Sequence, residues 1–272
     1  MNLQKKANDI RKDIVTLIHK NKTGHIGGDL SVTDILVDLY YKQMNVSPEN
    51  VHDENRDRFI LSKGHSVEAL YCVLADKGYF PKEELFNTYS QFGSKFIGHP
   101  NNKINGVEMN SGSLGHGLSV AVGMALAGKM DKKDYRVYVV MGDGEMAEGS
   151  VWEGIMAGHQ YKLDNLTAFV DRNRLQISGT TEQVMAQDSQ EERWASFGWN
   201  VISIPGNDIE AIDNAVELAK HVKGKPTVII ANTTKACGVS FMENQAGWHH
   251  RVPTDDEYTQ AMKELDERGA AL

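Results

Sequence analysis

Two short apolar segments end in residues that could hold a metal ion. Residues 136–141 are followed by the sequence Gly-Asp-Gly-Glu at 142–145, and residues 166–170 lead to Asn173. One carboxylate, one amide oxygen and a nearby main-chain carbonyl would leave several positions open on an octahedral cation. Mg²⁺ is commonly shared in this way between a protein and the phosphates of a ligand. A plain β-turn with Asp143 as its acceptor is the simpler interpretation of Gly-Asp-Gly alone. The amide after the next apolar segment favours a metal that bridges the protein to a diphosphate.

Histidine is the second residue type with an unusual pattern. Five of the ten histidines directly follow a glycine: His25, His65, His99, His116 and His159. The unperturbed pKa of histidine suits proton transfer at neutral pH, and a preceding glycine fits a backbone pressed against a ligand. A hydrogen-bonded structural role is the simpler interpretation of His116 and His159. No pair of histidines has the spacing of a zinc helix and no cysteine accompanies them, which disfavours a zinc site.

Composition and charge indicate the general class of protein. The chain has 272 residues, with 29 Lys and Arg against 37 Asp and Glu, a formal charge of −8. An acidic balance argues against a nucleic-acid partner. The N-terminus lacks a signal-peptide pattern, and the most apolar stretch, residues 118–127, is about half of what a bilayer requires. Cys72 and Cys237 form no pattern. We therefore expect a cytoplasmic protein with reduced thiols and no membrane contact.

The elements that must position these side chains are readable from periodicity. Four almost wholly apolar segments predict buried strands: residues 136–142, 166–171, 199–205 and 226–232. Helical stretches are expected between them: residues 149–161, 187–197 and 208–221. This alternation predicts an α/β fold, a doubly wound and mostly parallel sheet with helices on both faces and right-handed crossovers. Ligands of such sheets bind at the carboxyl ends of the strands, so residues 142–145 and 171–173 should lie side by side.

The ends of the chain predict further helices. Residues 2–21 have helical spacing of apolar side chains, and residues 255–272 read as an amphipathic helix. Ser31 begins a Ser-Val-Thr-Asp sequence that resembles a capping box, and the helix it opens should run to about Tyr41. No repeat or linker divides the chain, so we predict one domain over residues 1–272.

Segments that cover nearly the whole chain resemble the transketolase family in order. Residues 142–179 resemble its thiamine-diphosphate motif, and the remaining segments resemble its Gly-His stretches and its closing histidine loop: residues 24–31, 56–71, 97–100, 106–127 and 233–253. The resemblance implies thiamine diphosphate as cofactor, with Mg²⁺ as the metal and Ca²⁺ or Mn²⁺ as its substitutes. The implied metal ligands are Asp143, Asn173 and the carbonyl of Leu175.

The same resemblance implies further site residues. Those for the cofactor are His65, Gly112, Ser113, Leu114, Gly142, Asp143, Gly144, Glu145, Asn173, Leu175 and His250. Those for catalysis are His25, His65, His99 and His250. His250 fits better than His249 because the family pattern ends in His-x-x-Pro. Glu148 matches a carboxylate that links paired active sites, whereas a solvated helix N-terminus is the simpler interpretation of Glu145 and Glu153.

The chain stops where the family continues. The pyrimidine-binding domain, which supplies the glutamate that activates the cofactor, and the C-terminal domain are missing. We therefore predict the N-terminal subunit of a split transketolase, although a cut chain would fit too. The expected partner is a C-terminal subunit with the pyrimidine-binding domain, in an α₂β₂ heterotetramer. The expected reaction moves a two-carbon ketol unit from a ketose phosphate to an aldose (phosphate), as in the pentose phosphate pathway.

Three alternatives remain open from the sequence. The first is a split relative that acts on an unusual sugar, such as apulose phosphate or a sulfosugar, or that forms dihydroxyacetone. The second is a fragment similar to deoxyxylulose-phosphate synthase. The third is a catalytically silent module that keeps the fold, which the intact Asp143 and Asn173 disfavour.

Overall fold

The predicted strands form one parallel sheet in the computed structural model, which describes residues 1–187 and 189–272. The strands are β1 (Arg58–Leu61), β2 (Val137–Gly142), β3 (Leu166–Arg172), β4 (Asn200–Pro205) and β5 (Thr227–Asn232). Their order is β1-β2-β3-β5-β4, and every neighbouring pair is parallel. The predicted α/β fold is therefore confirmed. The edge strand β1 was not predicted, because its four residues are too few to show a pattern.

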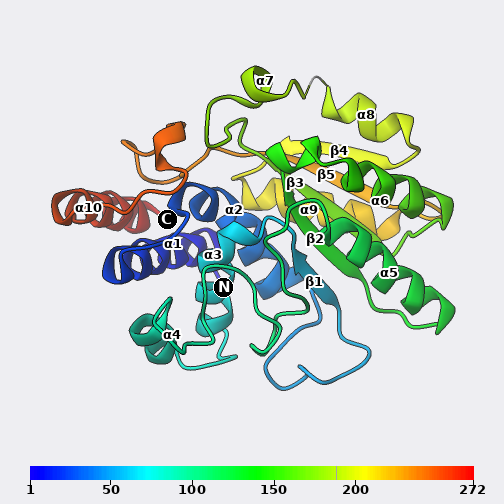
Figure 1. Ribbon diagram of the computed structural model, residues 1–272. Coiled ribbons are helices and arrows are strands. Elements are labelled where there is room, and N and C mark those ends of the chain that lie inside the picture. Colours follow the sequence, from blue (N-terminus) through cyan, green and yellow to red (C-terminus); the bar gives the residue numbers. More distant parts are fainter. Residues whose placement is uncertain (188) are drawn as a thin grey trace.

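Helices cover both faces of the sheet, as Figure 1 shows. Alternate residues of each strand point to opposite faces: Tyr138 and Val140 join one apolar core, and Val139 and Met141 join the other. The first core holds α1 (Leu3–Asn21), α2 (Ile26–Asp38), α3 (Val67–Asp76) and α9 (Ile209–His221). The second core holds α5 (Gly117–Met130), α6 (Gly149–Gln160) and α8 (Gln190–Ser196). Two buried faces explain why the central strands are apolar without alternation.

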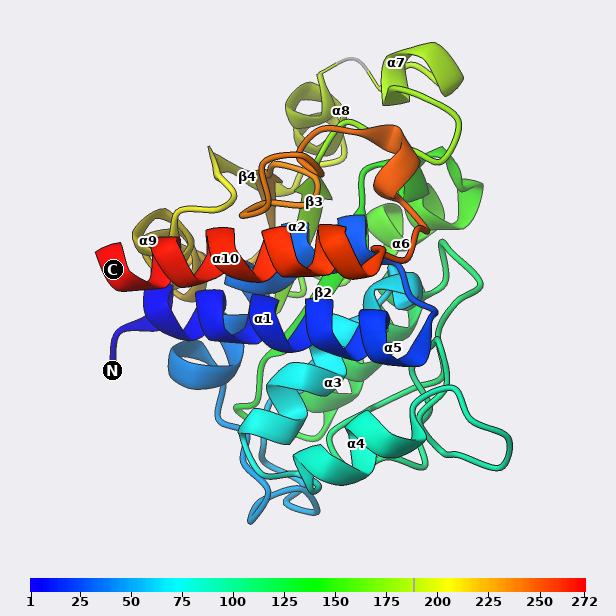
Figure 2. The ribbon, with the colours of Figure 1, turned by 90° about the vertical axis from the view of Figure 1, so that its left-hand side faces the viewer.

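The remaining elements lie around these layers. They are α4 (Lys82–Thr88), α7 (Thr181–Val184), α10 (Asp255–Ala271), a π-helix (Leu39–Gln43) and three short 3₁₀ helices (Gly64–Ser66, Gly144–Ala147 and Ala246–Trp248). Helix α10 lies alongside α1 (Figure 2) and brings the side-chain amide of Asn2 within 2.9 Å of the Leu272 carbonyl oxygen. Among the described residues, none of the helices has the length and apolar character needed to cross a membrane.

Most predicted helices are present with small shifts of their ends. The predicted start at Ser31 is wrong: α2 begins at Ile26, with His25 as its N-cap residue. Ser31 lies inside the helix, and its hydroxyl donates to the Gly28 carbonyl oxygen at 3.0 Å and to Asp171 Oδ2 at 2.7 Å. A buried partner on another element therefore replaces the predicted capping role. The predicted helix over 187–197 corresponds to α8, and residue 188 lies outside the described residues.

Candidate functional site at the carboxyl edge of the sheet

A pocket of about 350 Å³ lies where β1, β2 and β3 end. Most of the predicted site residues line it: His25, His65, Gly112, Leu114, Gly142, Asp143, Gly144, Glu145, Asn173 and Leu175. Three predicted residues lie outside this lining: His99, Ser113 and His250. The pocket therefore gathers side chains from segments that are far apart in the chain, at the edge where parallel sheets bind ligands.

The carboxylate side of the pocket is built on strand ends. Gly142 pairs with Asp171 in the sheet register, and the main-chain N–H of Asp143 donates to the Asp171 carbonyl oxygen at 3.3 Å. Asp143 Oδ1 accepts from the N–H of Gly144 at 2.8 Å, and Asn173 Oδ1 accepts from the N–H of Leu175 at 3.1 Å. The predicted neighbourhood of the two segments is therefore present. Asp143, Asn173 and Leu175, whose oxygens are the predicted metal ligands, all line this pocket.

The electrostatics of Asp143 favour a cation beside it. Burial raises the pKa of Asp143 to about 6, and the nearby Asp171 adds to the rise. A divalent cation would restore the charged form. The donor set is all oxygen, which suits Mg²⁺. On these grounds the residues fit a small divalent cation.

Glu145 differs from the expectation of a solvated side chain. It is 2% exposed, and burial raises its pKa. Its carboxylate accepts from the N–H of Gly115 at 2.8 Å, from the N–H of Gly142 at 3.2 Å and from the Ser62 hydroxyl. Glu145 therefore joins the ends of β1 and β2 to the loop before α5. Glu145 can be buried because two main-chain N–H groups replace the water around its carboxylate.

Two buried lysines complete the pocket, and neither was predicted from the sequence. Lys63 Nζ donates to Asp171 Oδ2 at 2.5 Å and to the Gly28 carbonyl oxygen at 3.1 Å. Lys235 Nζ donates to the Leu175 carbonyl oxygen at 3.1 Å and lies 2.8 Å from His249 Nδ1. Burial, followed by the charge of Lys63, lowers the pKa of Lys235 to about 8. Two ammonium groups in the same pocket as Asp143 and Asn173 make it suitable for a diphosphate. The only sequence signal was a lysine just before Gly-His at 64–65.

The predicted histidines do come together. The ring of His25 lies 5.6 Å from that of His65, 6.0 Å from that of His99 and 4.5 Å from that of His250, measured between ring centroids. The pKa of His25 is lowered to about 4, first by burial and then by His250. Burial also lowers the pKa of His65 and His99. Neutral imidazoles can both donate and accept, as proton transfer requires.

The last histidine pair has one member inside the pocket and one outside. His249 lines the pocket, and its ring stacks on that of His65 at 5.3 Å. Burial and the adjacent Lys235 lower the pKa of His249 to about 3. His250 is exposed, although its ring contacts that of His25. Sequence spacing favoured His250, and the pocket geometry favours His249.

Glycine keeps the pocket open at one point. A Cβ atom on Gly28 would lie 2.7 Å from Ser66 Oγ and 3.5 Å from both His65 Nε2 and Lys63 Nζ. Any side chain there would fill the space between the histidine and the lysine. The remaining residues singled out from the sequence lie elsewhere: His116, Glu148 and Glu153 are exposed, and His159 packs against Gly198.

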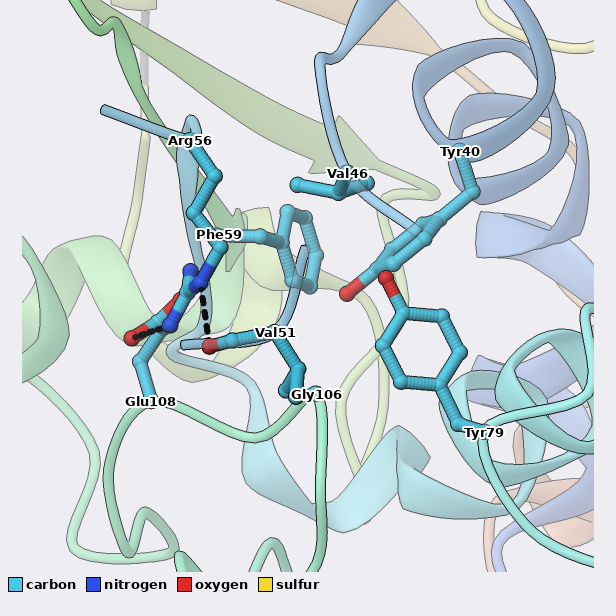
Figure 3. Close-up of a pocket in the computed structure, with 8 residues that line it drawn as sticks. All are labelled: Tyr40, Val46, Val51, Arg56, Phe59, Tyr79, Gly106 and Glu108. Atoms are coloured by element: carbon cyan, nitrogen blue, oxygen red, sulfur yellow. Dashed lines mark hydrogen bonds and ion pairs between the residues drawn. The ribbon is translucent and has the colours of Figure 1, made fainter. Parts of the chain in front are cut away.

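A second, much smaller cavity lies near the amino end of β1 (Figure 3). Its volume is about 10 Å³, room for roughly one water molecule. The buried hydroxyl of Tyr40 lines it without a partner in the described part of the chain. Arg56 and Glu108 form an ion pair at its wall. The size and position of this cavity fit a structural water.

The fold and the pocket define a class of protein: an α/β domain with a pocket of carboxylates, lysines and histidines at the carboxyl edge of a parallel sheet. Residues 3–267 match the family described as "Transketolase, thiamine diphosphate binding domain". The chain belongs to this family.

Several relatives resemble this chain over almost its full length. It is 51% identical to a subunit of the apulose-4-phosphate transketolase of Phocaeicola vulgatus, covering 98% of this chain and 94% of that protein. It is 42% identical to a 6-deoxy-6-sulfo-D-fructose transketolase subunit of Clostridium sp., covering 99% and 98%. The crystal structure of the Campylobacter jejuni transketolase superposes with a TM-score of 0.89 at 31% identity, covering 99% of this chain and 43% of that one. The chain thus corresponds to one part of full-length transketolases.

Proposed function

We propose that this chain is the cofactor-holding subunit of a split transketolase that acts with a second chain. The observation that carries the proposal is the pattern of coverage. Relatives named as subunits match over 94% and 98% of their own length, whereas human transketolase matches over 42%. Because this chain matches separate subunits over nearly their whole length, we expect a second chain to carry the pyrimidine-binding domain. We therefore propose that residues 1–272 form one diphosphate- and metal-binding domain.

Different residues of the pocket would hold the metal ion and the diphosphate of the cofactor. Asp143, Asn173 and the carbonyl of Leu175 would hold Mg²⁺, and Lys63 and Lys235 would face the diphosphate. Because Lys235 already donates to that carbonyl, its ammonium group would compete with the metal for the same oxygen. Thiamine diphosphate, when bound, supplies the nucleophilic carbon and the electron sink for cleaving and forming a carbon–carbon bond.

The histidines would handle the protons of the sugar hydroxyls. His25 is central to the ring cluster, and we assign it, His65 and His99 to the substrate channel. His249 is proposed as the channel residue from the closing loop, since it lines the pocket and contacts Lys235. His250, the sequence-based choice, would act from the rim. The lowered pKa values keep the buried rings neutral near pH 7, so each ring offers one N–H donor and one acceptor nitrogen to the sugar hydroxyls.

The second chain would cover the open side of the pocket. Ile177 lines the pocket yet is 75% exposed, which favours an apolar partner surface over the rim. Met130 on α5 and Met156 on α6 are also exposed. A contact between two copies of this chain through α5 and α6 would complete a two-fold α₂β₂ assembly.

The relatives favour an unusual sugar over the pentose phosphate pathway. Their names specify apulose 4-phosphate and 6-deoxy-6-sulfo-D-fructose. We therefore propose a branched or modified ketose as donor, with apulose 4-phosphate first, and an aldose phosphate as acceptor. This replaces the expectation of an ordinary ketose phosphate.

The test combines the chain with a candidate partner that carries the pyrimidine-binding domain. Ketol transfer is measured from apulose 4-phosphate, 6-deoxy-6-sulfo-D-fructose and xylulose 5-phosphate to a common aldose phosphate. We expect turnover only with both chains, Mg²⁺ and thiamine diphosphate, and a kcat/KM for apulose 4-phosphate at least about 10-fold above that for xylulose 5-phosphate. Turnover without thiamine diphosphate would contradict the cofactor assignment, and a preference for xylulose 5-phosphate would contradict the substrate class.

A further inference from the structure

Two carboxyl groups lie fully buried behind the histidine side of the pocket. Asp29 stands near the beginning of α2 and Glu68 near the beginning of α3, and both are 0% exposed. The two carboxyl groups are neighbours, and the pKa of Asp29 is raised first by burial and then by Glu68. Asp29 Oδ1 accepts from the N–H of Ala69 at 2.9 Å, and Glu68 Oε1 accepts from the hydroxyl of Tyr89 at 2.5 Å. Each carboxyl group therefore has one oxygen with a conventional donor.

The second oxygen of each carboxyl group lacks such a donor in the described part of the chain. Asp29 Oδ2 and Glu68 Oε2 are buried, and neither has a donor among the residues that the structure describes. Two adjacent carboxylates without solvent would repel strongly, so one of them must carry a proton. A single proton held between these oxygens would give each of them a partner. The remaining negative charge lies at the N-termini of α2 and α3, where helix dipoles favour it.

The same pair supports the three segments that carry the channel histidines. The main-chain N–H of His25 faces the Glu68 carboxyl group, and a Cβ atom on Gly24 would lie only 2.8 Å from Glu68 Oε1. His65 precedes Glu68 by three residues, in the 3₁₀ turn that leads into α3.

The third segment is reached through a tyrosine. A Cβ atom on Gly98 would lie 3.7 Å from the Tyr89 hydroxyl, the same hydroxyl that donates to Glu68. Gly98 is followed directly by His99. The carboxyl pair thus contacts the segment of His25, follows that of His65 in the chain and reaches that of His99 through Tyr89, although it does not line the pocket itself.

We propose that Asp29 and Glu68 share one proton and act as a positioning pair that holds the segments of His25, His65 and His99 around the pocket. This inference deepens the proposed function and rests on it for the role of the histidines. The pair touches neither substrate nor cofactor. Its contribution is geometry: the shared proton lets two acids pack where one acid alone would lack a donor.

The experiment compares amide and alanine variants of the full chain with its partner. In Asp29→Asn and in Glu68→Gln, the amide N–H₂ donates to the remaining carboxylate in place of the shared proton. We expect each amide variant to keep kcat within about threefold, and each alanine variant to lose at least about 10-fold in kcat with a smaller change in KM. Glu210→Gln, an exposed glutamate on α9, is the matched control and should change nothing.

Two further readouts do not depend on activity. Infrared difference spectra of wild type minus Glu68→Gln, and of wild type minus Asp29→Asn, should contain the carbonyl stretch of one protonated carboxylic acid at pH 7. In ¹³C-histidine-labelled chain, the resonances of His25, His65 and His99 should shift in the alanine variants and return in the amide variants. These spectra remain informative if ketol transfer fails with every sugar.

The outcomes separate cleanly. Absence of the acid band from both difference spectra would overturn the shared proton. Amide variants as impaired as the alanine variants would also overturn it, because a shared proton is replaceable by an amide. Unchanged histidine resonances in folded alanine variants would overturn the positioning role. If alanine variants fail to fold, the amide variants and the infrared spectra decide.

Discussion

The two sides of the pocket are built on different principles. On the carboxylate side, Asp143 and Glu145 follow β2, and their oxygens accept from main-chain N–H groups. On the histidine side, His25 and His65 stand where α2 and α3 begin, and side chains such as Glu68 support them. Main-chain donors follow from the register of the sheet, whereas side-chain supports depend on pairs that meet only in the folded chain. The carboxylate side should therefore tolerate changes on the histidine side, and the reverse should also hold.

Removing the Asp143 carboxylate, a proposed metal ligand, should have the largest effect of the changes considered. Asp143→Ala removes the only carboxylate among the proposed metal ligands, so Mg²⁺-dependent affinity for thiamine diphosphate should fall at least about 100-fold. The chain should still fold, because the pKa of this buried carboxyl is raised and its charge does not favour the folded state. Isothermal titration calorimetry of the chain with its partner measures the affinity.

Asp131→Ala, at an exposed position after α5, is the control for this change and should bind as wild type does. The histidine resonances should be the same in both variants. An unchanged affinity in Asp143→Ala would contradict the metal assignment, and shifted histidine resonances would show that the two sides are coupled.

Lys63 is the residue that connects the two sides. Its ammonium group bonds to Asp171 at the end of β3 and to the Gly28 carbonyl oxygen in α2, and the ion pair is buried. Lys63→Met would leave the Asp171 charge with the hydroxyl donors of Ser31 and Thr233. We expect a loss of about 3–5 kcal/mol in the free energy of unfolding, measured with urea.

Lys235→Met sharpens this prediction as a matched lysine variant. Lys235 is equally buried but has no carboxylate partner among the residues that the structure describes, and its lowered pKa shows that burial disfavours its charge. Its removal should therefore leave the stability of the chain nearly unchanged and weaken cofactor binding. Equal losses of stability in the two variants would contradict the distinction between a lysine held in a buried ion pair and one without a carboxylate partner.

Glu145→Gln tests how much the carboxylate side owes to main-chain donors. The amide oxygen can keep one N–H partner, whereas its N–H₂ group would face the second donor and leave it without an acceptor. We expect a loss of about 1–3 kcal/mol in the free energy of unfolding. Glu153→Gln, which is exposed on α6, should stay within about 0.5 kcal/mol of wild type. Similar unfolding curves for both variants would mean that Glu145 does not join the three segments.

The difference between the two sides also explains what the sequence could predict. The central strands are continuous apolar runs, so the parallel sheet and the meeting of Asp143 with Asn173 follow from general rules. Two predictions were wrong for a common reason. Ser31 bonds to Asp171, 140 residues away, and Glu145 bonds to Ser62, 83 residues away. Local spacing contains no information about such partners.

The histidine side shows the same limit in another form. The family resemblance pointed to His25, His65 and His99, and the structure brings their rings together. The family pattern favoured His250 over His249, whereas the packed loop places His249 in the pocket lining and leaves His250 exposed. The Asp29–Glu68 pair left no sequence signal, since an acid near the start of a helix is ordinarily solvated.

The smallest predicted effect concerns the far end of α2. Asp38 is buried with both carboxylate oxygens unpartnered among the described residues, and burial together with Asp213 raises its pKa to about 7. Between about pH 4 and pH 7 the folded chain therefore holds a proton that the unfolded chain has lost. Stability must fall as pH rises through this range, by at most about 1.4 kcal/mol per pH unit for one group.

Asp38→Asn should remove this part of the pH dependence. Urea unfolding of wild type and variant at several pH values should give curves that converge near about pH 4 and separate toward about pH 7, with the variant the more stable. A constant difference across pH would contradict the protonated state of Asp38. Asp29 and Asp38 lie on the same helix, yet Asp29 faces the fully buried Glu68, whereas Asp213, the acid near Asp38, is ion-paired with Lys42. Asp38→Asn should therefore change stability alone and leave the histidine resonances and kcat as they are, whereas Asp29→Ala should change all three.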